Sequence, residues 1–212
     1  MRRCVDVVVA GVVALVLAPV MAVAALVVRR SLGPPVLFRQ TRIGRDGVPF
    51  EILKLRTMRP EVYVGEPDAA RDTPLGRRLR SMSVDELPQL VNVLRGDMSL
   101  IGPRPTLPEQ VERYTPRQHG RHAIRPGLTG WAQVNGRNSI SWPERIELDL
   151  WYIEHRSLRV DLKIVLRTAF RLLRPDGIYG AGGVNPGFPD PDTNAAPSTS
   201  PDASSTQPKS ST

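Results

Sequence analysis

The sequence predicts an α+β fold that is mostly helical and is attached to a membrane through its N-terminal segment. Three observations predict it: an unbroken apolar run over residues 7–28, a hairpin-like pattern over residues 32–58, and two helical segments after residue 142. Apolar length, alternation and helical spacing are the signals that separate these kinds of element. The expected organisation is a membrane helix (1–31), a single domain that carries the candidate site (32–175) and a Gly/Pro/Ser-rich tail that is expected to be disordered (176–212).

The N-terminal run VVVAGVVALVLAPVMAVAALVV carries no charge and is long enough to cross a bilayer. Basic pairs flank it, Arg2-Arg3 before and Arg29-Arg30 after, and the positive-inside tendency predicts that both ends face the cytoplasm. Pro19 lies near the middle and interrupts a helix. A re-entrant hairpin satisfies both conditions, and a kinked spanning helix is the alternative that the residues leave open. The run is too long for the apolar region of a signal peptide, and no polar cleavage region follows it.

The next stretch predicts a β-hairpin. VLFRQTRIG and VPFEILKLRTM are strand-like, and the residues between them, 45–47, form a turn. Lys54 and Arg56 in the second arm are expected to face solvent or a ligand. A polar loop is expected over residues 59–75, and a short basic helix over residues 75–82.

The stretch SVDELPQLVNVLRGDMSLIGPRP, residues 83–105, is the strongest candidate for a functional site. It places two adjacent carboxylates, Asp85 and Glu86, just after a group of arginines and before the Gly-Pro-Arg-Pro turn at residues 102–105. Arginine forks bind phosphate oxygens, and carboxylates bind Mg²⁺. The combination indicates a site for an anionic, phosphorylated ligand together with a metal ion.

A structural interpretation competes with this one. Ser83 and Glu86 have the spacing of a capping box, in which both side chains stabilise the start of a helix. Pro88 argues against it, because a proline past the first turn crowds a backbone carbonyl. A helix that begins nearer Leu87 would leave the carboxylates in the preceding turn, available for chemistry.

The C-terminal half of the domain predicts two helices after a polar region. A short helix is expected at PEQVERY, and residues 121–142 are expected to form a loop with one short strand. Helices are predicted over residues 143–155 and 161–174. The second has a wide apolar face and a basic side, which suits the interface of an anionic membrane; a core helix with a solvated basic face is the alternative. The basic residues are Lys163, Arg167, Arg171 and Arg174.

Composition limits the classes of partner. The formal net charge is +8, which favours anionic partners. Aromatic residues are sparse and no helix-turn-helix pattern is present, so a nucleic-acid partner is not expected. Cys4 is the single cysteine, which excludes an intrachain disulfide and a cysteine-based zinc cluster. The three histidines lack the spacing of metal ligands.

Four ordered segments carry a resemblance to a known family. They are RRCVDVVVAGVVALVLAPV, GPPVLFRQTRIGRDGVPFEILKLRTM, LGRRLRSMSVDELPQLVNVLRGDMSLIGPRP and RPGLTGWAQVNGRNSISW. Together they cover about residues 2–174, and the sequence resembles the bacterial sugar transferases, that is, the monotopic phosphoglycosyl transferases in their minimal, single-domain form.

The resemblance implies a reaction and its partners. Members transfer a sugar-1-phosphate from a nucleotide sugar, usually a UDP-sugar, to polyprenyl (undecaprenyl) phosphate in the cytoplasmic leaflet of the bacterial inner membrane. The transfer initiates the synthesis of exopolysaccharide or another glycan. A non-catalytic, membrane-anchored protein that binds anionic lipids on the same scaffold is the alternative.

The resemblance also implies roles for particular residues. Asp85 is expected to attack the sugar-linked phosphorus and form a covalent aspartyl phospho-sugar. Glu86 is expected to hold a Mg²⁺ cofactor. Substrate binding is expected from Arg80, Arg104, Gln133, Asn135 and Arg137.

The resemblance favours the re-entrant form of the N-terminal helix over a spanning one. Members break this helix at a proline that often follows a serine. Pro19 is present here, with Ala18 in place of the serine. The break is expected to persist, because the proline is its main cause.

Overall fold

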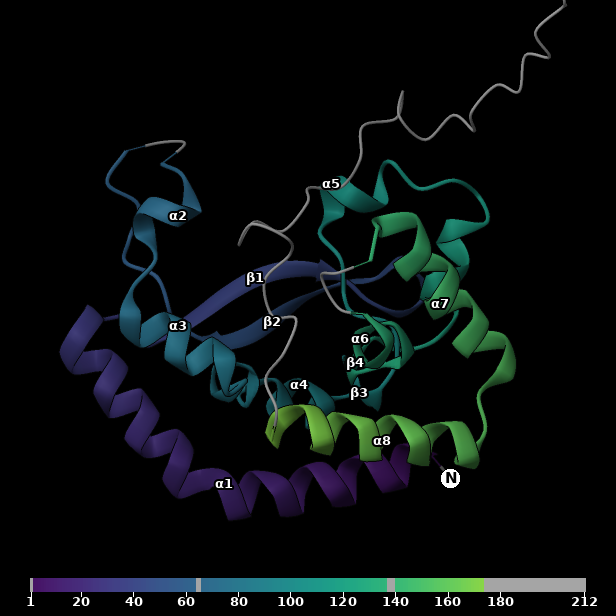
Figure 1. Cartoon of the computed structure of the whole chain (residues 1–212), viewed down its shortest axis with the longest axis horizontal. Helices are drawn as coiled ribbons and strands as arrows, with labels where there is room; N and C mark the ends of the chain where they lie inside the picture. The colour runs from purple at the N-terminus through teal and green to yellow at the C-terminus, as the bar shows by residue number, and fades with distance from the viewer. Residues whose placement is uncertain (1, 64–65, 137–139, 174–212) are drawn as a thin grey trace, which may run out of the picture.

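The computed structural model describes residues 2–63, 66–136 and 140–173. Helices and small sheets make up a mostly helical α+β arrangement (Figure 1). The first half contains α1 (Arg2–Leu32), β1 (Leu37–Ile43), η1 (Arg45–Gly47), β2 (Pro49–Leu55), α2 (Asp68–Arg71), α3 (Pro74–Ser81), η2 (Val84–Glu86) and α4 (Gln89–Arg95). The second half contains β3 (Ser99–Ile101), α5 (Pro108–Val111), η3 (Gln118–Ala123), β4 (Gly127–Thr129), α6 (Trp131–Asn135), α7 (Trp142–His155) and α8 (Leu158–Leu173).

Helix α1 lies along one side of the molecule and bends near its middle (Figure 1). Pro19 is inside the helix, and a proline removes a backbone hydrogen bond and crowds the preceding turn. By length and composition, α1 is the one helix in the described part of the chain that could cross a membrane. The predicted apolar N-terminal helix is therefore confirmed, and it is a single helix that bends near Pro19.

Both halves of α1 are attached to the same body. Near its start, Asp6 accepts hydrogen bonds from Ser99 Oγ (2.8 Å) and from the backbone N–H of Leu100 (3.1 Å). Near its end, Ala24 and Val28 are buried against apolar side chains of β2 and α3. The domain therefore contacts α1 both near its start and near its end.

Both basic residues at the start of α1 contact other helices of the same protein. Arg2 forms an ion pair with Asp161 of α8 at 2.9 Å. Arg3 donates to the carbonyls of Val93 and Leu94, the latter at 2.9 Å, in the last turn of α4. Helix C-termini leave carbonyls without intrahelical partners, and a cation is favoured there.

The predicted β-hairpin is confirmed. Strands β1 and β2 pair antiparallel, with Leu37 opposite Leu55 and Ile43 opposite Pro49, and η1 makes the turn. The prediction for Arg56 is wrong, because this side chain is buried at 8% exposure. It donates to the carbonyls of Leu32, Gly33 and Pro34, where α1 ends, and so satisfies groups that a helix terminus leaves unpaired.

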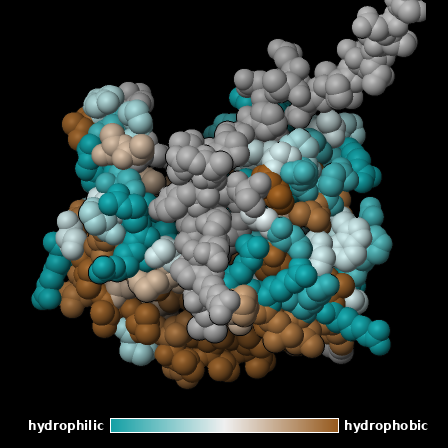
Figure 2. Space-filling model, in the orientation of Figure 1, coloured by the Kyte–Doolittle hydropathy of each residue, from teal (hydrophilic) through white to brown (hydrophobic). Residues whose placement is uncertain are grey.

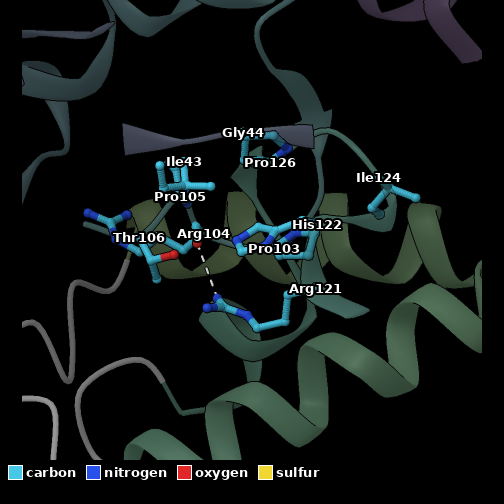
Figure 3. A pocket seen from close by; sticks show the side chains of 10 residues that line it. All are labelled: Ile43, Gly44, Pro103, Arg104, Pro105, Thr106, Arg121, His122, Ile124 and Pro126. Atoms are coloured by element: carbon cyan, nitrogen blue, oxygen red, sulfur yellow. Dashed lines mark hydrogen bonds between the residues drawn. The ribbon is translucent and has the colours of Figure 1, made fainter. Parts of the chain in front are cut away.

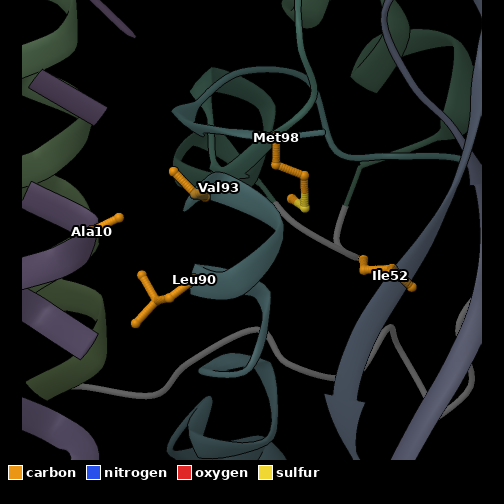
Figure 4. Close-up of a cluster of buried hydrophobic side chains, with 5 residues drawn as sticks. All are labelled: Ala10, Ile52, Leu90, Val93 and Met98. Carbon is orange, nitrogen blue, oxygen red and sulfur yellow. The ribbon is translucent and has the colours of Figure 1, made fainter. Parts of the chain in front are cut away.

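The main core is formed where α4 meets α1 and the hairpin. Leu90 and Val93 of α4 lie between Ala10 of α1 and Ile52 of β2, and Met98 closes the cluster (Figure 4). Small Ala10 allows α1 to approach α4 closely. Helix α4, which directly follows the predicted carboxylate pair, is thus fixed between α1 and the hairpin.

Besides α2, which lies in the expected polar loop, and η3, two short elements were not predicted from the sequence. The polar region at residues 121–142 contains the predicted short strand, β4, but also the short helix α6. Strand β4 pairs parallel with β3, a three-residue strand that the sequence did not predict. Both missed elements are too short to show a periodic pattern. Helix α8 begins at Leu158, three residues before its predicted start.

Apolar side chains are exposed together on one face. Figure 2 shows them as a band over α1 and α8, which lie near one another along the lower edge of Figure 1. The members on α8 with more than two-fifths of their surface exposed are Leu158, Leu162, Val165, Leu166 and Phe170. An apolar surface this extensive is typical of contact with a membrane or a partner. The predicted tail, 176–212, and Arg174 lie outside the described residues.

Candidate active site

The adjacent carboxylates Asp85 and Glu86 lie in the short turn η2, between α3 and α4. Ser83, at the start of this turn, has left-handed backbone angles (φ 56°, ψ 21°) and makes no side-chain cap hydrogen bond. Helix α4 starts only at Gln89, after Pro88. The capping-box interpretation is therefore wrong, and the carboxylates lie in the turn that precedes the helix, as Pro88 indicated.

The left-handed conformation of Ser83 leads to a stability prediction. The left-handed conformation destabilises a residue that has a Cβ by about 1–2 kcal/mol, most when the residue is β-branched, and it does not destabilise glycine. We expect Ser83→Val to lower the midpoint of thermal unfolding by several degrees and Ser83→Gly to leave it nearly unchanged. Ser81→Val, in the helical last residue of α3, is the control. Equal shifts for Ser83→Val and Ser81→Val would contradict the assignment.

Asp85 is held in an environment that disfavours its charge. The residue is 6% exposed. Burial, and then the neighbouring charge of Glu86, raise the pKa of Asp85 to about 6, although Lys54, Arg104 and Arg80 oppose the rise. Asp85 is therefore an ionisable carboxyl poised near neutral pH, which is typical of groups that carry chemistry.

Glu86 is held between two cations. Its Oε1 accepts from Lys54 Nζ at 2.9 Å and from Arg104 Nη2 at 2.8 Å. Burial by itself would raise the pKa of Glu86, but Arg104 and Lys54 outweigh it and hold this pKa well below the usual range. The environment thus separates the two pKa values: Glu86 stays ionised while Asp85 titrates near neutrality, a pattern that assigns different roles to paired carboxylates.

Arg80 lies close to the carboxylates and is fixed by other residues. Its Nη1 donates to Thr57 Oγ1 at 2.8 Å, and its Nη2 pairs with Asp72. The charge of Arg80 is near enough to lower the pKa of Asp85. The predicted arginine is therefore held beside the carboxylates in a defined orientation.

Arg104 reaches Glu86 from the Gly-Pro-Arg-Pro turn, whose position depends on close backbone packing. A Cβ at Gly102 would lie 2.5 Å from the carbonyl of Arg125, and one at Gly127 would lie 2.0 Å from the Gly102 nitrogen. Such distances exclude any larger residue without backbone movement. The β3–β4 pair thus fixes where the turn begins.

A buried ion pair holds the other side of this turn. Arg121 Nη2 donates to the Arg104 carbonyl at 3.1 Å (Figure 3). The same guanidinium binds Asp149 of α7 through Nη2 (2.6 Å) and Nε (3.0 Å), and Tyr114 through Nη1. Helix α7 therefore anchors the backbone of the residue whose side chain binds Glu86.

Sequence reasoning missed one further cation near the site, Arg42. It donates to Gln40 Oε1 at 2.6 Å and makes a long contact (3.5 Å) with the carbonyl of Pro105. Burial and the charge of Arg104 lower the pKa of Arg42 to about 10. Arg42 and Lys54 lie on the same face of the hairpin in the observed register, and that register was the missing information.

The predicted pocket residues on α6 are tied to other parts of the protein. Asn135 donates from Nδ2 to the Trp131 carbonyl at 2.8 Å, and its Oδ1 accepts from Arg167 of α8. The amide of Gln133 is buried without a hydrogen-bond partner among the described residues. A Cβ at Gly130 would lie 2.5 Å from Gln133 Oε1 and 2.1 Å from the Gly102 carbonyl, so this amide is near the start of the Gly-Pro-Arg-Pro turn. Arg137 lies outside the described residues.

The donor set fits a magnesium ion that a phosphorylated substrate completes. Within the described ranges, no cluster of three or more His, Cys, Asp or Glu side chains could hold a metal alone. Mg²⁺ commonly uses one or two protein carboxylates together with substrate phosphates and water. Glu86, the residue expected to hold the metal, supplies one such carboxylate, and both of its observed contacts are made by Oε1.

Comparisons with known proteins identify a family for this chain. The family "Bacterial sugar transferase" matches residues 1–175. A sugar transferase of uncharacterised function from Bacillus subtilis, EpsL, is 50% identical over 72% of this chain and 77% of its own length. A UDP-glucose:undecaprenyl-phosphate glucose-1-phosphate transferase of Caulobacter vibrioides is 47% identical over 84% of this chain and 72% of its own. An enzyme of the same name from Escherichia coli is 40% identical over 81% of this chain but only 40% of its own length.

The chain belongs to the bacterial sugar transferase family. The resemblance seen in the sequence is confirmed, and so is the expected enzyme class, a phosphoglycosyl transferase. These matches favour the catalytic interpretation over a lipid-binding protein without activity.

Proposed function

We propose that this protein transfers a sugar-1-phosphate from a UDP-sugar to undecaprenyl phosphate through a covalent intermediate on Asp85. The observation that carries the proposal is the Asp85–Glu86 turn surrounded by Lys54, Arg80 and Arg104. Both substrates are anions, and the cations allow a carboxylate to approach a phosphoryl group despite the shared negative charge. The names of the curated relatives support the two substrate classes.

The reaction proceeds in two displacements. An oxygen of Asp85 bonds to the phosphorus that carries the sugar, the bond from that phosphorus to the bridging oxygen breaks, and UMP leaves. An oxygen of undecaprenyl phosphate then attacks the same phosphorus, the bond to Asp85 breaks, and the carboxylate is restored. Carboxylate nucleophiles form such acyl phosphates in other enzymes.

Each neighbouring residue has a role that follows from its contacts. Arg104 and Lys54 hold Glu86 in place, and their positive charges, with that of Arg80, lie where phosphate oxygens must enter. Glu86 remains ionised and would hold Mg²⁺, which would supply further neutralisation of the phosphate charge. Arg42 adds a guanidinium to the same anion-binding surface.

The membrane arrangement is part of the proposal. Both halves of α1 are attached to the same body, which supports a re-entrant helix, because a straight spanning helix would carry one end away from the domain. The exposed apolar side chains of α1 and α8 would then lie in one leaflet. The domain would face the cytoplasm at the inner membrane, where nucleotide sugars occur, and exopolysaccharide or glycan synthesis would follow.

Nucleotide release tests the proposed function. Purified full-length protein in detergent would be incubated with Mg²⁺, undecaprenyl phosphate and, in turn, UDP-glucose, UDP-galactose and UDP-N-acetyl sugars. Release of UMP with at least one donor is expected. Release of UDP would mean transfer of the sugar without its phosphate and would contradict the proposal, as would the absence of release with every donor.

The pH dependence of the transfer follows from the raised pKa of Asp85. The nucleophile is the carboxylate, so activity is full above the pKa and declines as the pH falls through about 6. Below that value kcat/KM should fall about tenfold per pH unit, because one proton blocks the attack. Protonation of Glu86 does not contribute to this decline near pH 6, because the pKa of Glu86 is well below its usual range.

A control variant outside the site is needed for this profile, because activity at low pH can also fall through changes elsewhere in the protein. The variant His119→Gln should leave the decline in place. A profile that is flat down to pH 5 would contradict the assignment of Asp85, and so would a decline that disappears with His119→Gln.

A further inference from the structure

Helix α8 has two faces with different surroundings. Its exposed face carries the apolar side chains that continue the apolar band of α1 (Figure 2). Its opposite face, at helical spacing, consists of Ile164, Arg167, Thr168 and Arg171. The sequence suggested that the basic residues of this helix meet lipid or solvent; Arg167 and Arg171 instead contact the protein.

These inward contacts converge on α6. Arg167 donates to Asn135 Oδ1, and its guanidinium lies 5.3 Å from the centre of the Trp131 ring. Arg171 donates to the backbone carbonyl of Gln133 at 3.2 Å. Ile164 is fully buried beside Val134. Every residue of α6 from Trp131 to Asn135 except Ala132 is thus contacted by α8.

A short helix needs such support. Five residues cannot form a stable helix alone, because helix nucleation is unfavourable. The Gln133 amide, which lies near the Gly-Pro-Arg-Pro turn, has no hydrogen-bond partner among the described residues that would orient it. The backbone carbonyl of Gln133 is held by Arg171, and the next polar side chain on α6, Asn135, by Arg167.

We infer that Arg167 and Arg171 are positioning residues, which fix α6 on α8 so that Gln133 is presented to the nucleotide sugar. The inference rests on the proposed function for its substrate. Neither arginine touches the Asp85–Glu86 turn in the described structure, so they act on donor binding and not on the attack at phosphorus. One helix thereby carries the membrane-facing surface and also orders a segment of the substrate pocket.

Hydrogen exchange of full-length protein in lipid nanodiscs tests the contact without reference to activity. In the double variant Arg167→Ala/Arg171→Ala, amides of α6 should exchange about tenfold faster or more, since hydrogen bonds from charged groups contribute at this level. Amides of β2 should not change. Arg159→Ala removes one positive charge from the same helix at a residue that makes no contact with α6 among the described residues, and it should leave α6 at the wild-type rate.

Nucleotide release with a varied UDP-sugar concentration tests the consequence. The double variant should raise the donor KM about tenfold with kcat within about threefold, and Arg159→Ala should match the wild type. Unchanged exchange and unchanged KM would overturn the inference while leaving the transfer reaction intact. An equal rise of the donor KM in Arg159→Ala would also overturn the inference, because the net positive charge of α8 would then be the cause. If the wild type released no nucleotide, the proposed function would fail, and exchange would still decide whether α8 orders α6.

Discussion

Replacing Asp85 by asparagine should abolish transfer without unfolding the protein. Asparagine has nearly the same shape but no carboxylate oxygen to attack phosphorus, so release of UMP should fall at least about 10³-fold. Rates of UMP release by the variant and the wild type, at saturating donor and acceptor, provide the measurement.

The stability of the same variant separates chemistry from folding. The raised pKa of Asp85 means that its ionised form is disfavoured in the folded protein relative to the unfolded chain. This cost is present at pH 7, above both pKa values, and it disappears as the pH falls below them. Asp85→Asn should therefore leave the thermal midpoint at pH 7 unchanged or raise it. Asp46→Asn, at an exposed turn of the hairpin, is the control and should retain activity. Transfer retained by Asp85→Asn would remove the covalent mechanism.

Asp149→Ala should be among the most destabilising substitutions in the domain. Asp149 is 1% exposed and binds Arg121 through two hydrogen bonds. Removing one partner leaves a buried guanidinium without its counter-charge, which costs about 3–5 kcal/mol. For a chain of this size, we expect the thermal midpoint to fall by roughly 10 °C or more.

The same helix offers a matched control for this substitution. Glu147 of α7 also pairs with an arginine, Arg117 at 2.8 Å, but its side chain is 54% exposed. Exposed pairs contribute about 1 kcal/mol or less, so Glu147→Ala should shift the midpoint by no more than a few degrees. Similar shifts for Asp149→Ala and Glu147→Ala would contradict the anchoring role of the buried pair.

Long and strongly patterned elements could be predicted from the sequence. The apolar run predicted α1, and alternation with a turn predicted the hairpin. Pro88 indicated that the carboxylates precede α4, because a proline restricts where a helix can continue. These signals are local, and each depends on only a few neighbouring residues.

What could not be predicted depends on contacts between distant segments. Arg56 was predicted to face solvent or a ligand from its place in the strand, but it is buried because α1 ends beside it. Arg167 and Arg171 were predicted to lie on a basic side that faces a membrane or solvent, but α6 lies against them. The support of Arg104 by Arg121 joins residues 17 positions apart, and that of Arg121 by Asp149 joins residues 28 apart. The periodicity of apolar residues in the sequence does not indicate which distant residues pair with one another.

The measurement that tests the central claim most directly is the mass of the protein after reaction with donor alone. Without undecaprenyl phosphate the second displacement cannot occur, and the phospho-sugar should remain on Asp85. We expect intact-protein mass spectrometry to show one added sugar phosphate, located by digestion in the peptide that contains Asp85 and absent from Asp85→Asn. UMP release that requires the acceptor, with no added mass on the protein, would contradict the covalent mechanism and indicate direct transfer between the two substrates.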